Sequence, residues 1–123
     1  MKRPSDEEIL ARIIAGAKAS GRRVMRGDYG VWNGDMPDGP VCAVGAGCLY
    51  AGISKIGDQH HRKFAGPAHA FAEAHGTSFD FALGVSDGFE TLTIARVMDR
   101  KDDYERGVNV GIAAFAALVE DAP

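Results

Sequence analysis

The feature that most constrains the fold is residues 41–53, which belong to the longest stretch of the chain without a charged residue and include both cysteines. An apolar run of this length favours a buried helix over a strand, although each glycine in a helix costs about 1 kcal/mol relative to alanine. Ala43, Gly47 and Ala51 share one helical face, on which another backbone could approach closely. We therefore predict a glycine-rich central helix over residues 41–54.

Capping signals and apolar spacing predict a helix on each side of this stretch. Ser5 and Glu8 match a capping box, which predicts a helix over residues 6–20. Pro67 suits the first position of a helix that ends at Gly76. The residues expected to face the core from these two helices are Ile9, Ile13, Ala17, Ala68, Phe71 and Ala72.

The region that follows is less regular. Thr77 or Ser78 is expected to cap a helix that Ser86-Asp87-Gly88 ends, since these are turn-forming residues. Apolar alternation over residues 79–85 also permits a short strand. A further short helix, or a strand as the weaker alternative, is predicted over residues 92–98.

The last predicted helix begins at a cap formed by Asp102 or Asp103 and extends to about Glu120, since its apolar residues recur at i, i+3 and i+4. A chain of 123 residues has the length of one domain. We predict an all-α single domain, a bundle of five to six helices around the central one. The alternative is an α+β fold, with a hairpin over residues 24–32 and a strand over residues 79–85.

Composition restricts location and partners. The net charge is −3 and the basic residues are dispersed, so we expect no nucleic-acid partner. No apolar run reaches the roughly 18 residues of a membrane-spanning helix, and the acidic start does not match a secretory signal. Cys42 and Cys48 would be separated by about 9 Å along a helix, which favours free thiols. These features predict a cytoplasmic protein without a membrane partner.

The order of these elements resembles a family of small uncharacterised proteins from bacteria and their phages, a domain of unknown function. The family has a Cys-Ala-Leu-Gly-Ala helix and a later Asn-Asp turn before a final helix. Residues 42–46 match the helix motif with Val44 in place of Leu, and Ser86-Asp87 stands where Asn-Asp is expected. The resemblance implies a mostly helical fold and no assigned activity.

A cysteine at a helix start can have a lowered pKa and act as a nucleophile. Cys42 has this predicted position, and His69, His75 and Asp87 could supply a base and an orienting group. The alternative prediction is therefore a cysteine-dependent hydrolase with Cys42, His75 and Asp87. A buried thiol that acts as a small apolar residue is the simpler interpretation.

No cofactor or metal site is predicted. The histidines and cysteines lack zinc-ligand spacing, and His60-His61 lies in a basic loop. The glycines match neither a phosphate-binding loop nor a dinucleotide motif. Residues 86–90 lack the alternating acidic ligands of a calcium loop.

The predicted ligand site surrounds the start of the central helix, because Trp32, Asp35 and Asp38 lie in a glycine-rich loop, residues 27–40, that returns there. Its expected residues are Trp32, Cys42, Tyr50, Asp87 and Glu90. Under the simpler interpretation, Trp32 covers the core and Asp87 caps its own helix. The favoured function is a non-enzymatic binding or regulatory module for a protein or small polar ligand, and we expect a phage or mobile-element accessory protein. The remaining alternative is a structural subunit of a larger assembly, and a homo-oligomer is compatible with either.

Overall fold

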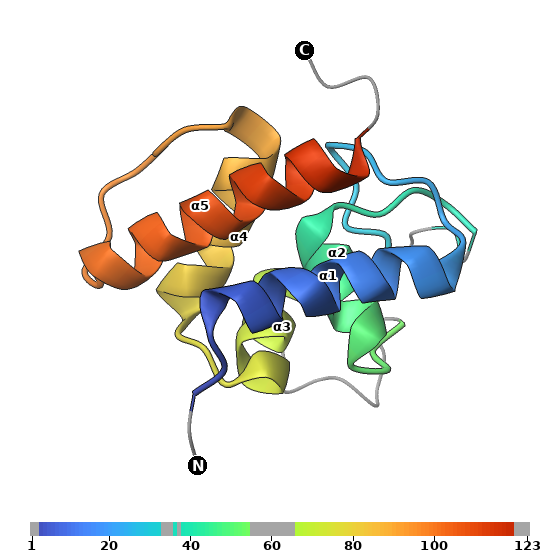
Figure 1. Ribbon diagram of the computed structural model, residues 1–123, viewed down its shortest axis with the longest axis horizontal. Helices are drawn as coiled ribbons and strands as arrows, with labels where there is room; N and C mark the ends of the chain where they lie inside the picture. Colours follow the sequence, from blue (N-terminus) through green and yellow to red (C-terminus); the bar gives the residue numbers. More distant parts are fainter. Residues whose placement is uncertain (1–2, 33–35, 37, 55–65, 120–123) are drawn as a thin grey trace.

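Five α-helices form the described part of the protein (Figure 1). The structure is a computed structural model and describes residues 3–32, 36, 38–54 and 66–119. The helices are α1 (Asp6–Ser20), α2 (Ala43–Tyr50), α3 (Pro67–His75), α4 (Phe79–Thr91) and α5 (Lys101–Leu118). These described residues are 62% helical, well above the roughly one third that is typical of globular proteins. The all-α prediction is confirmed.

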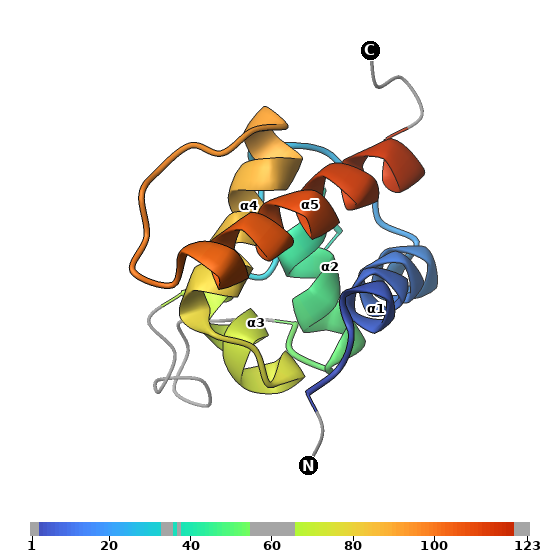
Figure 2. The same cartoon turned by 60° about the vertical axis from the view of Figure 1, so that its left-hand side comes forward.

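Helix α2 occupies the centre and contacts each of the other four helices, as Figure 2 shows. Residues 43–48 are all buried, and buried residues of all five helices join one apolar core. The helix is shorter than predicted at both ends. Cys42 is the N-cap rather than part of the first turn, and its Sγ accepts the Gly45 N–H at 3.5 Å. The chain turns at Ala51 and Gly52 instead of continuing to residue 54.

The predicted small-residue face of α2 is only partly buried. Gly47 faces a side chain rather than a backbone, because a Cβ added there would overlap the buried ring of Phe71. Ala51 lies beyond the helix and is exposed. The close backbone approach occurs on another side, where Gly16 of α1 lies against the Ala46 carbonyl.

Local capping explains why α1, α3 and α4 begin or end where predicted. The Ser5 hydroxyl accepts the Glu8 N–H at 3.1 Å, and the Ser78 hydroxyl accepts the Phe81 N–H at 3.1 Å. Gly76 ends α3 in the left-handed conformation. The predicted caps of α5 are wrong. Arg100 is its N-cap, and Asp102 and Asp103 lie in the first turn.

Helix α4 continues through Ser86-Asp87-Gly88 to Thr91, so the predicted break there is wrong. The Asp87 carboxylate does not compete for nearby backbone N–H groups, because it bonds to Arg96 and Tyr104 instead. The predicted helix over residues 92–98 is also wrong. Leu92 ends α4 with a φ of 60°, and the following segment is irregular and exposed.

Glycines bring α4 and α5 into direct backbone contact. Gly84 and Gly88 of α4 lie against the carbonyls of Tyr104 and Val108. Gly107 and Gly111 of α5 lie in turn against carbonyls of α4, those of Phe81 and Val85. Each pair is spaced i, i+4, so each forms one smooth face that permits close packing. In Figure 1, α5 passes across α4 at this contact. This packing is the reason that Gly88 lies within a helix rather than at its end.

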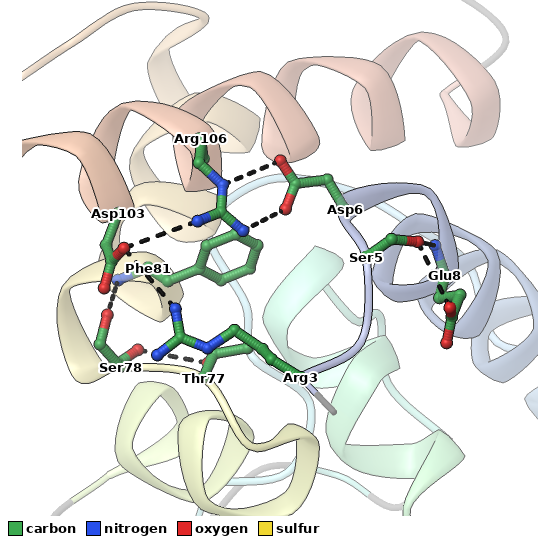
Figure 3. A network of polar contacts seen from close by, with 9 residues as sticks. All are labelled: Arg3, Ser5, Asp6, Glu8, Thr77, Ser78, Phe81, Asp103 and Arg106. Atoms are coloured by element: carbon green, nitrogen blue, oxygen red, sulfur yellow. Dashed lines mark hydrogen bonds and ion pairs between the residues drawn. The ribbon is translucent and has the colours of Figure 1, made fainter. Parts of the chain in front are cut away.

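Polar contacts join the start of α1 to α5 (Figure 3). Arg106 of α5 binds the Asp6 carboxylate through two nitrogens, at 2.7 and 3.2 Å. Asp103 pairs with Arg106 at 3.6 Å and with Arg3 at 3.8 Å. Because Arg106 is well exposed, this network orients the two helices more than it stabilises them.

Residues 24–32, all of which the structure describes, form isolated bridges and no hairpin strand, so the α+β alternative is wrong for both of its parts. Val24 forms an isolated parallel bridge with Val41, and residues 79–85 belong to α4. The Arg22 guanidinium holds the segment by donating to the carbonyls of Gly30 and Gly39. No helix of the described ranges combines the length and apolar character needed to cross a membrane.

His75 is a buried polar residue of the core and joins three helices. Its Nε2 lies 2.9 Å from the Gly47 carbonyl of α2, and its Nδ1 lies 3.3 Å from an Arg12 nitrogen of α1. A neutral ring satisfies both contacts, since Nε2 then donates and Nδ1 accepts. Burial lowers the pKa of His75 below its ordinary value near 6.5, and the Arg12 charge acts in the same direction.

We predict that replacing Gly111 with alanine destabilises the protein by about 1–3 kcal/mol, because the new Cβ would overlap the Val85 carbonyl. Asn109→Ala is the matched control, since Asn109 is an exposed residue of the same helix. It should be neutral or slightly stabilising. Urea unfolding of the three proteins measures both effects. Equal stabilities for Gly111→Ala and the native protein would show that α4 and α5 are not in backbone contact.

We also predict that stability falls as the pH drops below about 6.5. The unfolded state then takes up a proton on His75 that the folded state binds less readily, because the folded pKa is lowered. The free energy of unfolding of the native protein should therefore decrease more between pH 7.5 and pH 5.5 than that of His75→Gln. Carboxylates contribute alike to both proteins. Identical decreases would contradict the role of His75.

Candidate functional site

An aromatic cavity of about 460 Å³ lies between the segment at residues 27–32, the start of α3 and one face of α4. Its side-chain walls include Trp32, His69 and Phe79, together with Tyr29 and Leu83. Trp32 is 42% exposed and Phe79 is 44% exposed, so the aromatic wall faces solvent. A cavity of this size and composition is typical of small-molecule sites.

A second cavity of about 170 Å³ adjoins the first. The two share Gly27, Asp28 and Tyr29, and the smaller one is otherwise lined by Cys42, Ser86 and Glu90. It is the polar end of the combined site. We call the two together the aromatic–acidic pocket.

One stripe of α4 lines both cavities. Phe79, Leu83, Ser86 and Glu90 follow each other at helical spacing and lie on the side that does not pack on the glycines of α5. The first two line the aromatic cavity, and the last two line the polar one. The stripe therefore changes from apolar to acidic along the pocket.

Three contacts hold the opposite wall against α4 and α2. The Arg26 Nε donates to the Phe89 carbonyl at 2.9 Å, and the Gly27 N–H donates to Glu90 Oε1 at 2.7 Å. Gly45 of α2 lies directly against the Tyr29 carbonyl, where a Cβ would not fit. These contacts place Tyr29 between the two cavities.

Glu90 is the unusual group of the pocket. Its Oε1 accepts the Gly27 N–H, but its buried Oε2 has no hydrogen-bond partner in the parts of the chain that the structure describes. A buried polar atom without a partner costs free energy. Native proteins contain few such atoms, and each calls for a physical explanation.

Burial also changes the pKa of two weakly acidic side chains beside Glu90, those of Tyr29 and Cys42. It raises the pKa of Tyr29, although a hydrogen bond with Ser86 opposes the change. Burial is likewise the main reason that the pKa of Cys42 rises to about 12, and the nearby charge of Glu90 adds to it. Cys42 is only 4% exposed. Both groups are therefore protonated at neutral pH.

The structure does not assemble the alternative triad. Cys42 Sγ contacts the Gly45 N–H, and both His75 nitrogens are engaged by Arg12 and the Gly47 carbonyl. The Asp87 carboxylate bonds instead to Arg96 and Tyr104. Among the described residues, these three side chains bond to different groups and not to one another.

Asp87 and Tyr50, both predicted ligand residues, lie outside the pocket. Asp87 is 7% exposed and forms a bidentate pair with Arg96 at 2.7 and 2.8 Å. The Tyr104 hydroxyl also donates to it at 2.6 Å. Asp87 therefore does not begin a turn or cap a helix, but holds the segment after α4 against α5. Tyr50 is exposed on another part of the surface, near Arg12 and His75.

Within the described ranges, no group of three or more His, Cys, Asp or Glu side chains could hold a metal ion. His60 and His61 lie outside the described residues, as does Asp35 of the predicted loop. His69 lines the aromatic cavity and packs edge-on against Phe79, with the ring centres 6.1 Å apart.

Comparisons with known protein families, with curated proteins and with solved structures found no significant match to this chain. The geometry of the pocket therefore carries the functional argument.

Three of the five predicted ligand residues, Trp32, Cys42 and Glu90, line the pocket. The prediction did not include Tyr29 and Asp28, because no local pattern distinguishes them within the glycine-rich segment. The sequence signal that could have found the rest is the i, i+4, i+7, i+11 spacing of Phe79, Leu83, Ser86 and Glu90, which places them on one side of a helix.

We predict that iodoacetamide reacts slowly with Cys42 in the native protein at pH 7.5, since the thiol is buried and protonated. The variant Cys48→Ala isolates the reaction of Cys42. Mass spectrometry should show rapid modification only after denaturant is added. Rapid modification of the native variant would reveal an accessible thiolate and would restore the hydrolase alternative.

Proposed function

We propose that the protein is a non-enzymatic binding module whose ligand occupies the aromatic–acidic pocket. The observation that carries this proposal is the cavity of about 460 Å³ whose aromatic side chains come from three separate segments. Trp32 comes from the segment before α2, His69 from α3 and Phe79 from α4. A ligand there would contact parts of the chain that are distant in sequence.

The exposure of these aromatic rings supports a binding role. Apolar surface that faces solvent is costly, and this surface is concave rather than scattered. Aromatic walls with a few polar groups at one end are the usual construction of a ligand pocket. The protonated Cys42 and the separate partners of His75 and Asp87 supply no activated nucleophile, which favours binding over hydrolysis.

The proposed wider role of the protein rests on its resemblance to the family of small bacterial and phage proteins. An accessory function in a bacterium or a phage, and a cytoplasmic location, remain part of the proposal. Neither the accessory function nor the cytoplasmic location requires a catalytic group in addition to the binding pocket.

Trp32 offers a direct test, because it is the only tryptophan of the chain and lines the cavity. We predict that 2-phenylethanol, a neutral probe, changes the Trp32 fluorescence in a saturable manner. Phe79→Ala should weaken this binding about ten-fold, because an aromatic contact is lost.

The matched control is Tyr50→Ala, which removes an exposed aromatic ring outside the pocket. It should leave the affinity unchanged. Equal weakening by both substitutions, or a fluorescence change that does not saturate, would contradict a site at this cavity.

A further inference from the structure

We infer that the ligand of the aromatic–acidic pocket carries an ammonium group, which lies between Asp28 and Glu90 while an apolar body occupies the aromatic cavity. This inference rests on the proposed function and specifies its ligand class.

Among the described residues, the charges that line the pocket have one sign. Asp28 lines both cavities and Glu90 lines the inner one, and the described walls include no Lys or Arg. Arg26 is the arginine nearest to Asp28 in the sequence, and its guanidinium contacts groups that do not line the pocket. Its guanidinium donates to the Phe89 carbonyl and lies 3.9 Å from the centre of the Phe115 ring. The described side chains that line the pocket therefore give it a negative potential.

The unpartnered oxygen of Glu90 indicates where this potential is strongest. Oε2 is withdrawn from solvent, so water screens its charge poorly. A cation in the adjoining cavity, which Glu90 lines, would therefore be attracted strongly. An ammonium group would satisfy the orphaned acceptor as well as the charge.

The outer cavity suits the rest of such a ligand. Trp32, Tyr29 and Phe79 offer ring faces and edges to an apolar body, and aromatic faces attract a nearby cation in addition. A bare metal ion fits less well, because the described residues hold no three-ligand cluster of His, Cys, Asp or Glu. An anion is disfavoured by both carboxylates.

Three probes with the same phenylethyl body separate charge from shape. They are 2-phenylethylamine, which is protonated at neutral pH, 2-phenylethanol and 3-phenylpropanoate. Titration followed by Trp32 fluorescence, excited where the probes do not absorb, gives the three affinities. The ammonium should bind about ten-fold more tightly than the alcohol, and the carboxylate more weakly than the alcohol. Added salt should weaken the ammonium complex and leave the alcohol complex unchanged.

Glu90→Gln tests the assignment to a residue, since its amide oxygen can still accept the Gly27 N–H. It should reduce the preference for the ammonium over the alcohol to about two-fold. Glu7→Gln is the matched control, because it makes the same charge change at an exposed position on α1. It should leave all three affinities unaltered.

The outcomes distinguish this inference from the function on which it rests. Equal binding of ammonium and alcohol would overturn the inference and would leave the binding module intact. Tightest binding of the carboxylate would also overturn it. Failure of all three probes to bind would overturn the proposed function and this inference with it.

One further titration identifies the source of the ammonium. Binding of N-acetyl-lysine methylamide as tight as that of 2-phenylethylamine would support a lysine side chain of a peptide. Weaker binding of the capped lysine would support a free arylalkyl amine.

Discussion

The backbone contact between α4 and α5 is the constraint on which the rest of the structure depends. Four glycines allow it, two on each helix, and side chains at these positions would force the helices apart. The contact fixes the rotation of α4 about its own axis. Asp87 is thereby directed to Tyr104 and Arg96, while the stripe from Phe79 to Glu90 is directed to the pocket. One helix thus separates a structural ion pair from a candidate binding surface.

The two acidic residues of α4 illustrate how surroundings decide roles. Asp87 is the more deeply buried, but an arginine and a tyrosine satisfy both of its oxygens. Glu90 lies one turn further along and has a partner for one oxygen only. A fully bonded buried carboxylate stabilises a particular arrangement, whereas a half-bonded one costs stability. A buried polar atom without a partner is expected more often at a functional site than elsewhere, which is why we infer that the ammonium group lies beside Glu90 rather than beside Asp87.

Much of the fold was predictable, because caps and apolar spacing act locally. Ser5 and Ser78 fixed the starts of α1 and α4. The predicted helix end at Ser86-Asp87-Gly88 was wrong because it relied on the turn preference of these residues. Packing of α4 on α5 keeps them helical instead. The spacing of Gly84 and Gly88, repeated at Gly107 and Gly111, was the available signal. The site was harder to predict, since Tyr29 and Asp28 meet α4 only through tertiary contacts.

Cys42 shows why the pocket is better suited to binding a cation than to thiol chemistry. Two causes keep its thiol protonated, and burial is larger than the charge of Glu90. A cation held beside Glu90 would offset only the smaller cause, and burial would still raise the pKa of the thiol. The sulfur is left with its structural role, accepting the Gly45 N–H at the start of the central helix.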